Sequence, residues 1–203
     1  METKKVLKFN RELRATIETS IEKRFNVNSD LGQRPIGEIV EAKVIDIVKL
    51  KFGDAFIGAS GKKSCDDLSV QDGDIRFMYD VKTHHIQKNG FSMPNLISVD
   101  VLRRKVLTQK NVELSYIFID YTRNGDVVEI VEVKIINIYQ FHWDILGIGA
   151  IGKGQIQIKN ANKKMLMNEN VDEKEWCDLL KQNINLFYNK QIVKTRKMME
   201  IWS

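Results

Sequence analysis

The spacing of apolar residues predicts two helices in the first quarter of the chain. In residues 6–25 they recur every three or four positions, at Val6, Phe9, Leu13, Ile17 and Ile21. Residues 33–37 contain Pro and Gly and are expected to form a turn. The same spacing runs from residue 36 to about residue 51, at Ile36, Val40, Val44, Ile47 and Val48. This second helix carries Glu38 and Glu41, which are three residues apart and therefore share one side.

Residues 65–82 predict a hairpin. Asp72-Gly73 is typical of a two-residue turn, and it would place Leu68 opposite Phe77 and Asp67 opposite Met78. Side chains then separate onto two faces. The apolar face holds Leu68, Val70, Ile75, Phe77, Tyr79 and Val81. The polar face holds Asp67, Met78, Asp80 and Lys82.

The polar face of this hairpin has the composition of a metal-dependent nuclease site. Asp67 and Asp80 are diagonal neighbours in the predicted register, roughly 7–8 Å apart at the backbone, so both carboxylates can turn toward one cation. Mg²⁺ prefers such oxygen ligands and binds one or two carboxylates together with phosphate oxygens. The ammonium of Lys82 can orient an attacking water and stabilise the phosphate. A solvated strand face with salt bridges fits the same pattern, and the pattern alone leaves both interpretations open.

A second acid-x-Lys triplet, Glu132-Val133-Lys134, lies in a second hairpin predicted for residues 113–121 and 127–138. Its turn is predicted at Asn124-Gly125, which would place Asp120 opposite Glu129 and on the face away from Glu132 and Lys134. We therefore interpret this triplet as structural.

The remaining segments complete a mixed α/β pattern. Residues 84–95 are polar, and residues 96–107 have helical periodicity. Residues 172–200 predict a C-terminal helix with Asp172 as its N-cap and Glu175 as the capping-box partner. The glycine-rich residues 147–154 lack the context and the Lys-Ser/Thr ending of a nucleotide-binding loop, so no nucleotide cofactor is expected.

The chain resembles the PD-(D/E)XK nuclease superfamily, and within it the type II restriction endonucleases of the HincII and EcoRV group. The similar stretches span residues 37 to about 180: Gly37-Glu38-Ile-Val-Glu41, Asp80-Val-Lys-Thr, Met93-Pro94-Asn95-Leu96-Ile97-Ser98, Gln155-Ile156-Gln157-Ile158 and Glu173-Lys-Glu-Trp176. The resemblance implies that Asp67, Asp80 and Lys82 are the catalytic acid, acid and lysine, joined by Glu41. Asp66 stands where the family usually has Pro, so Asp66 is an alternative to Asp67.

The same resemblance implies a central mixed sheet flanked by helices, Mg²⁺ as the cofactor, and a homodimer that cuts a palindromic site in double-stranded DNA to blunt ends. Its loop after residue 84 departs from HincII, so the recognition sequence cannot be carried over. Basic and polar residues at loops and strand ends are the expected DNA contacts: Lys62, Lys63, Thr83, His84, Lys88, Asn89, Asn95, Ser98, Lys153, Gln155 and Gln157.

Length and charge agree with this interpretation without deciding it. The 203 residues suffice for one domain, no Pro/Ser-rich linker divides them, and the net charge of +5 suits a polyanionic partner. No stretch predicts a membrane span or a signal peptide, which favours the cytoplasm. Two other functions remain open: a repair or recombination nuclease that recognises DNA structure, and a DNA-binding protein without catalytic activity.

Overall fold

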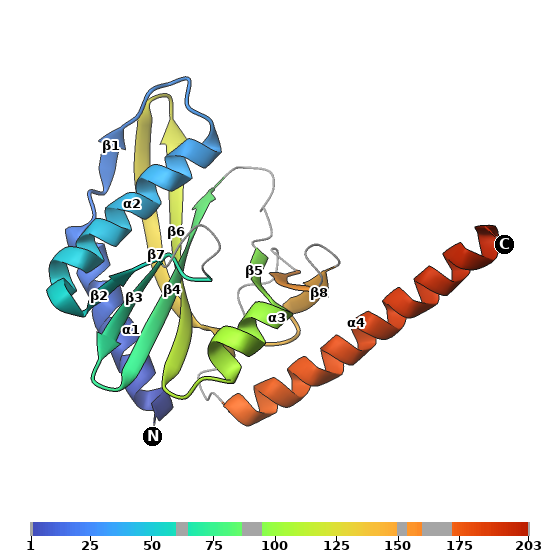
Figure 1. The fold of residues 1–203 in the computed structure, drawn as a ribbon. Coiled ribbons are helices and arrows are strands. Elements are labelled where there is room, and N and C mark those ends of the chain that lie inside the picture. Colours follow the sequence, from blue (N-terminus) through green and yellow to red (C-terminus); the bar gives the residue numbers. More distant parts are fainter. Residues whose placement is uncertain (1, 60–64, 87–94, 150–153, 160–171, 203) are drawn as a thin grey trace. The chain divides into compact units, whose positions relative to one another are not determined.

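The computed structural model describes every residue except 1, 60–64, 87–94, 150–153, 160–171 and 203, and these residues form two sheets (Figure 1). The larger sheet has the order β1-β7-β6-β4-β3-β2. Its strands are β1 (Arg24–Asn26), β2 (Phe56–Gly58), β3 (Leu68–Asp72), β4 (Ile75–His85), β6 (Val112–Asn124) and β7 (Val127–Asn137). The smaller sheet has the order β5-β9-β8, with β5 (Asn95–Ser98), β8 (Leu146–Gly149) and β9 (Gln155–Ile158).

The sheets belong to two compact units, Met1–Ser92 with Arg104–Ile138 and Met93–Arg103 with Tyr139–Ser203. The first unit contains helices α1 (Glu2–Ser20) and α2 (Gln33–Phe52) and the short 3₁₀ turn η1 (Gly53–Ala55). The second contains α3 (Val99–Leu102) and α4 (Glu173–Trp202). The π-helical η2 (Arg103–Leu107) and the 3₁₀ turn η3 (Ile138–Gln140) each contain residues of both units. The single-domain prediction stays a prediction. None of the described helices is long and apolar enough to cross a membrane.

One hydrophobic core holds α1 and α2 against one face of the larger sheet (Figure 1). The helices contribute the predicted apolar positions, including Leu13, Ile17, Val40 and Val44, and the sheet contributes Phe77 and Tyr79 among others. β4 and β6 run parallel whereas the other pairs of this sheet are antiparallel. The mixed α/β prediction is therefore confirmed. Since Asp80 and Lys82 alternate with core residues along β4, they lie on the opposite face of the sheet.

Three predicted element boundaries are wrong. The first helix ends at Ser20 and not at residue 25, because buried Phe25 lies in β1 and pairs with Val128 of β7. Residues 33–37 are the first turn of α2, where Pro35 is tolerated because the leading amides of a helix lack intrahelical partners. Residues 96–107 begin with β5, since Asn95 and Ser98 pair with β9, and only then become helical.

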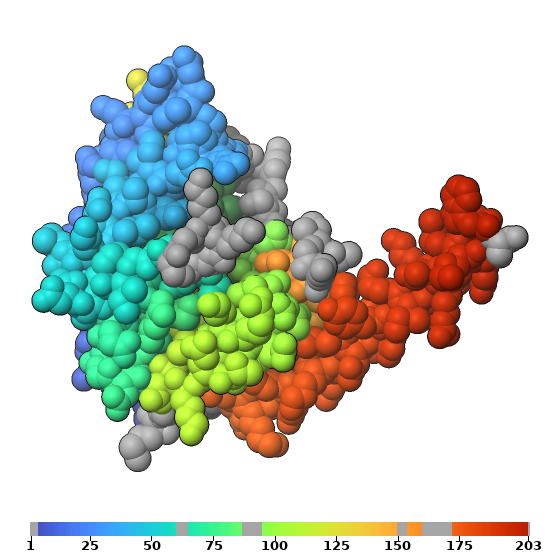
Figure 2. Space-filling view, in the orientation of Figure 1, coloured from blue at the N-terminus to red at the C-terminus, as the bar shows by residue number. Residues whose placement is uncertain are grey.

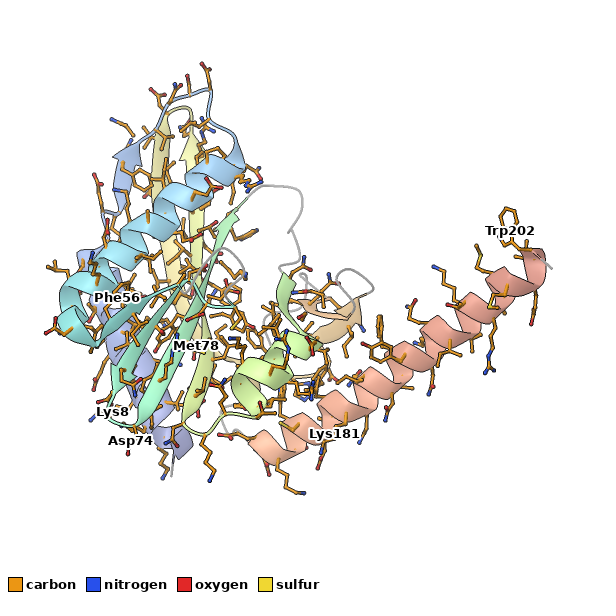
Figure 3. The ribbon with its side chains drawn as sticks, in the orientation of Figure 1. Lys8, Phe56, Asp74, Met78, Lys181 and Trp202 are labelled. Carbon is orange, nitrogen blue, oxygen red and sulfur yellow. The ribbon has the colours of Figure 1, made fainter. Side chains whose placement is uncertain are left out.

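The turn of the first hairpin is one residue later than predicted. Asp72 pairs with Ile75, so the central turn residues are Gly73 and Asp74, and Gly73 has a φ of 59° (Figure 3 labels Asp74). A positive φ at the first central position is the feature of a type II′ turn, for which glycine is favoured. Leu68 therefore faces Tyr79, not Phe77. This change moves each pairing by two residues, so the predicted faces are preserved.

A buried hydrogen-bond chain ties α1 to the sheet behind the polar face. The Tyr79 hydroxyl donates to Asn10 Oδ1 at 2.9 Å, and Asn10 Nδ2 donates to Ser115 Oγ at 2.9 Å. Asn10 and Tyr79 are 4% and 0% exposed, so a missing partner in this chain is not easily replaced by water.

Replacing Tyr79 with phenylalanine should therefore lower the free energy of unfolding by about 1–3 kcal/mol, because the Asn10 carbonyl loses its donor in a buried place. The midpoint of urea unfolding measures this change. Thr19→Val is the control, since it removes an exposed hydroxyl from the same helix α1, whose bonds to the Ala15 and Thr16 carbonyls water can replace. Equal midpoints for Tyr79→Phe and the wild type would contradict the assigned hydrogen bond.

Candidate active site

Asp80 and Lys82 form a close ion pair on β4. The Lys82 Nζ lies 2.8 Å from Asp80 Oδ1 and 2.7 Å from Oδ2. The Lys82 side chain is 26% exposed and the Asp80 side chain is 14% exposed. Because their alternation along the strand puts both on one face, the lysine can hold both carboxylate oxygens at once.

Asp67, just before β3, extends the same hairpin toward Asp80. Its backbone N–H donates to the Tyr79 carbonyl at 2.8 Å, and its Oδ2 accepts from the Val81 N–H at 2.7 Å. The observed pairing of β3 with β4 ends at Leu68 and Tyr79, so Asp67 lies just beyond the paired residues. Asp67 acts on Asp80 through its charge and through a side-chain hydrogen bond, so the two carboxyl groups lie beside each other.

Burial raises the pKa of Asp80 to about 7. The Lys82 ammonium and its hydrogen bond oppose this shift, whereas the Asp67 charge reinforces it. The Asp80 charge also changes the pKa of a neighbouring tyrosine. The pKa of buried Tyr116, the β6 partner of Asp80, lies well above its usual value because of burial and of the Asp80 charge. The site therefore gathers negative charge in a place where solvation is poor, and a bound cation would relieve this repulsion.

Asp80→Asn should raise the melting temperature in EDTA at pH 8 by about 5 °C and leave it nearly unchanged near pH 4. The pKa of Asp80 is about 7 in the folded protein and 3.8 in the unfolded chain. The folded protein therefore loses stability as the pH rises from about 4 to 7, and above pH 7 the loss is complete. Glu38→Gln, an exposed carboxylate, is the control. A melting temperature for Asp80→Asn below that of the wild type at pH 8 would contradict the cost of this charge.

Glu41 of α2 approaches the same group. Its pKa is raised, first by burial and then by the Asp67 charge, while the Lys82 charge lowers it. Glu38 instead pairs with Arg34, with Nε to Oε1 at 3.1 Å, and is 63% exposed. Of the two glutamates on this helix, Glu41 is therefore the one that faces Asp67 and Lys82.

Asp66 and Asp67 have different surroundings. The Asp66 side chain is 2% exposed and receives Arg76 Nη2 at 3.3 Å. Arg76 also donates from Nε to Ser69 Oγ at 3.1 Å, which links the start of the hairpin to β4. Asp66 thus serves this buried ion pair, and Asp67 is the acid that faces Asp80.

Two residues of the site were not predicted from the sequence: Arg76, which pairs with Asp66, and Tyr116, which lies beside Asp80. Arg76 lies on β4 with Met78, Asp80 and Lys82 at alternate positions, and this alternation could have assigned it to the polar face. Tyr116 could be assigned only from the pairing of β4 with β6, which the local sequence does not specify.

The donor set fits a magnesium ion. Asp67 and Asp80 supply hard oxygen ligands, and Mg²⁺ typically takes one or two carboxylates from the protein. Among the residues that the structure describes, no group of three or more His, Cys, Asp and Glu side chains has the geometry of a metal site. The pair Asp67 and Asp80 would therefore hold the ion together with water and phosphate oxygens. Since Lys82 contacts both Asp80 oxygens, it would have to give up at least one of them.

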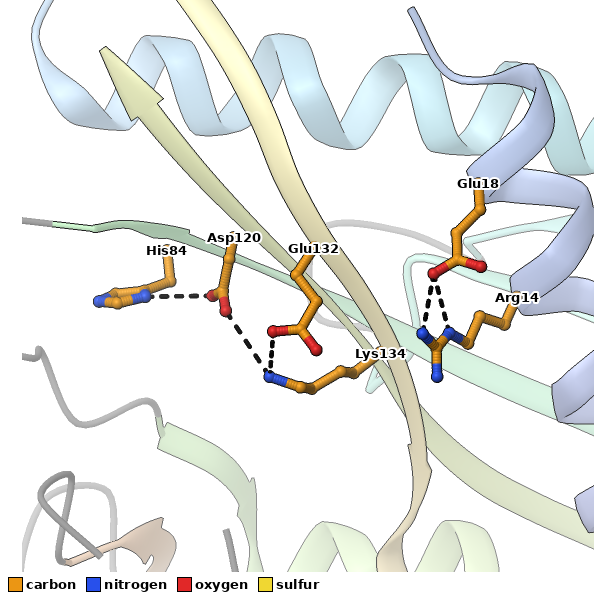
Figure 4. A network of polar contacts seen from close by, with 6 residues as sticks. All are labelled: Arg14, Glu18, His84, Asp120, Glu132 and Lys134. Atoms are coloured by element: carbon orange, nitrogen blue, oxygen red, sulfur yellow. Dashed lines mark hydrogen bonds and ion pairs between the residues drawn. The ribbon is translucent and has the colours of Figure 1, made fainter. Parts of the chain in front are cut away.

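A second polar cluster lies farther along the same face of the sheet (Figure 4). Lys134 Nζ lies 2.6 Å from Glu132 Oε2 and 3.9 Å from Asp120 Oδ2, and His84 Nδ1 lies 3.1 Å from Asp120 Oδ1. The prediction that Asp120 faces away from Glu132 and Lys134 is wrong. An irregularity skips Val131, so Asp120 pairs with Glu132.

The predicted DNA contacts of the first unit are divided between two faces. His84 lies on the side of Asp80 and Lys82, bonded to Asp120. Thr83 lies on the opposite side, against α2, where a Cβ on Gly37 would come within 2.6 Å of its Oγ1. His85 likewise stacks on Tyr121, with 5.2 Å between the ring centroids, so the two histidines point in opposite directions. Lys62, Lys63, Lys88, Asn89 and Lys153 lie outside the described residues.

The second unit brings the other predicted contacts together on its small sheet. Asn95 pairs with Gln157 and Ser98 with Gln155, and the Gln157 amide donates to Asn95 Oδ1. A side chain at Gly149 would overlap the Gln157 amide, so glycine keeps this side of the sheet open. Ser98 has a structural task, because its hydroxyl accepts from the Val101 N–H at 3.3 Å and caps α3.

No protein-family model and no curated protein matches the chain. Among solved structures, the NlaIV restriction endonuclease is similar in fold, with a TM-score of 0.53 over 79% of this chain and 74% of that one, at 14% sequence identity. The chain therefore has a restriction-endonuclease-like fold. The narrower resemblance to the HincII and EcoRV group stays a prediction.

Proposed function

We propose that the chain is a Mg²⁺-dependent type II restriction endonuclease that hydrolyses phosphodiester bonds in double-stranded DNA. The observation that carries this proposal is the group Asp67, Asp80 and Lys82, in which two acids meet across a hairpin beside one lysine. The similarity in fold to a restriction endonuclease supports the same activity. Glu41 joins this group as a further acid of the site.

Each member of the group has a separate chemical task in this proposal. Asp67 and Asp80 hold the ion, with the Asp67 carboxylate fixed by the Val81 N–H. Bound Mg²⁺ would lower the pKa of a water ligand and offset charge on the phosphate. Lys82, once released from one Asp80 oxygen, orients the attacking water and donates to the phosphate oxygens. Glu41 contributes negative charge near Asp67 and could accept a hydrogen bond from a water molecule at the site.

The proposed DNA contacts divide into two kinds. His84, Asn89 and the lysines Lys62, Lys63, Lys88 and Lys153 are assigned to phosphates, whereas Thr83 lies on the opposite face of the sheet, against α2. Asn95, Gln155 and Gln157 offer amides, which recognise adenine edges through paired hydrogen bonds. A homodimer would place two such sites on the two strands of a palindrome, and central cleavage of both strands would leave blunt ends.

Incubation with a mapped plasmid tests the proposal. The protein should produce a fixed set of fragments with Mg²⁺ and none with EDTA, and sequencing of the ends should return one palindrome cut at its centre. Fragments with random ends, or cleavage confined to branched DNA, would indicate a nuclease that recognises structure. Binding without cleavage under all metal conditions would contradict the proposed enzyme.

Asn95→Ala and Gln155→Ala should each lower cleavage of the specific site by about 10-fold to 100-fold, the effect of about 1–3 kcal/mol per base contact. Binding to random DNA should stay almost unchanged, because phosphate contacts dominate it. Competition binding with specific and random duplexes measures the ratio. Equal losses on both duplexes would show that these amides hold only the DNA backbone.

A further inference from the structure

The C-terminal half of α4 exposes an unusual number of large apolar side chains. The helix begins with Trp176 and Leu180 buried, each 3% exposed, yet every residue from Ile192 to Trp202 is exposed. Figure 2 draws this end of the helix in red. Of the twelve large hydrophobic side chains that are exposed among the described residues, eight belong to α4. They are Leu186, Tyr188, Ile192, Val193, Met198, Met199, Ile201 and Trp202.

Most of these side chains follow one stripe along the helix. At about 100° per residue, Tyr188, Ile192, Met199 and Trp202 fall within an arc of about 80°. Met198 follows Leu180 by about five full turns and lies on the same side. Only Met198 therefore continues the side of α4 that is buried at the start of the helix, and the centre of the stripe lies about 100° around the helix from Trp176 and Leu180. Figure 3 shows the ring of Trp202 at the end of the helix, where it is 85% exposed.

The exposed end of α4 lacks the packing that normally stabilises a helix. In folded proteins, packing of an apolar face supplies most of the stability of a helix. Residues 192–202 have no such packing among the described residues, since all of them are exposed. A surface that covers the stripe would both order this segment and remove apolar area from water.

The area of the stripe suits a second copy of the same helix. Tyr188, Ile192, Met198, Met199 and Trp202 are 45, 48, 50, 68 and 85% exposed. Together they expose roughly 700 Å². Two copies would therefore bury on the order of 1,400 Å², which is within the range of stable interfaces.

The stripe itself contains no charged residue, although Arg196 and Lys194 flank it at about 90° or more from its centre. Lys190 and Lys197 lie about 150° or more around the helix from the centre of the stripe. Two stripes can therefore meet while these ammonium groups stay in water on the outer sides. An isologous pairing of this kind, with the same patch on both subunits, is the usual way in which homodimers form.

We propose that this stripe of α4 is the surface through which two copies of the chain associate. The inference rests on the proposed function only in that it gives the proposed homodimer its surface. The apolar face itself is independent of any nuclease activity.

Light scattering of the full chain across a range of concentrations, without DNA or metal, tests the inference. The wild type should have the mass of a dimer, and Ile192→Asp combined with Met199→Asp should weaken association by at least about tenfold in Kd. Leu186→Asp combined with Val193→Asp is the matched control. These residues are 58% and 53% exposed and lie on the other side of the helix, so this variant should keep the wild-type Kd.

A monomeric wild type at every concentration would overturn the inference, as would equal effects of the two double variants. Far-UV circular dichroism of each variant should match the wild type, and the milder Ile192→Ala gives a second measurement if the charged variants lose helix. Asp80→Asn should retain the wild-type Kd. A dimer that behaves as expected but cleaves no DNA would contradict the nuclease and leave this surface in place.

Discussion

Asp80→Ala and Lys82→Ala should each lower plasmid cleavage by about a thousandfold or more while leaving the fold intact. Asp80→Ala removes one of the two carboxylates assigned to Mg²⁺, and Lys82→Ala removes the cation that contacts both oxygens of Asp80 at 2.7–2.8 Å. Initial cleavage rates of a mapped plasmid measure the loss. Circular dichroism and the melting temperature separate lost chemistry from lost structure.

The second cluster supplies matched controls for this prediction. Glu132 and Lys134 form the same acid-x-Lys triplet, with Lys134 Nζ 2.6 Å from Glu132 Oε2. Glu132→Ala and Lys134→Ala should stay within about tenfold of the wild-type cleavage rate. The reason is that catalysis is assigned to Asp80 and Lys82, which have the further acids Asp67 and Glu41 beside them. An inactive Glu132→Ala together with an active Asp80→Ala would move the catalytic group to the second hairpin.

Asp67→Asn and Asp66→Asn should have opposite effects on activity and stability. Asp67→Asn should lower cleavage by about a hundredfold or more with little change in stability, because its carboxylate faces Asp80 and is assigned to the metal. Asp66→Asn should lower the free energy of unfolding by about 2 kcal/mol, because it leaves Arg76 without its buried anionic partner. This value is at the low end for a buried pair because Arg76 is 35% exposed.

Urea unfolding and cleavage rates, measured on the same two variants, test this division. Cleavage by Asp66→Asn should stay near the wild-type rate per folded molecule. The reverse result, with an inactive but stable Asp66→Asn and an active Asp67→Asn, would show that Asp66 is the metal ligand and that Asp67 is structural.

The polar face of the first hairpin could be predicted from sequence although the pairing could not. Both hairpins have their turn one residue later than predicted, with Gly73 and Gly125 at positive φ in the first central position. Moving a turn by one residue changes each pairing by two, and side chains alternate with a period of two. Asp67, Asp80 and Lys82 therefore stayed on one face despite the wrong register.

In the second hairpin the predicted faces of the strands are not preserved. The irregularity at Val131 inserts one unpaired residue, and a change of one residue exchanges the faces beyond it. Asp120 consequently joins Glu132, Lys134 and His84, a cluster that the sequence analysis had excluded. Val131 is 53% exposed, and its apolar side chain gave no indication of a bulge.

Tertiary pairing explains the other differences. Residue 25 and residues 95–98 became strands because β7 and β9 lie beside them, and neither partner is close in sequence. The helical periodicity of α4 was correct, and the bond from the Glu175 N–H to Asp172 Oδ1 at 3.0 Å confirms the predicted N-cap. Within this helix only Trp176 and Leu180 are buried.

Binding of Mn²⁺, a paramagnetic substitute for Mg²⁺, tests the central claim most directly. Electron paramagnetic resonance of free Mn²⁺, titrated with protein in the absence of DNA, measures the affinity without relying on cleavage. The wild type and Glu132→Gln should bind the ion with the same Kd, and Asp67→Asn and Asp80→Asn should each weaken binding by at least about tenfold. Binding that survives in both aspartate variants, or that is lost in Glu132→Gln, would contradict a metal site between Asp67 and Asp80.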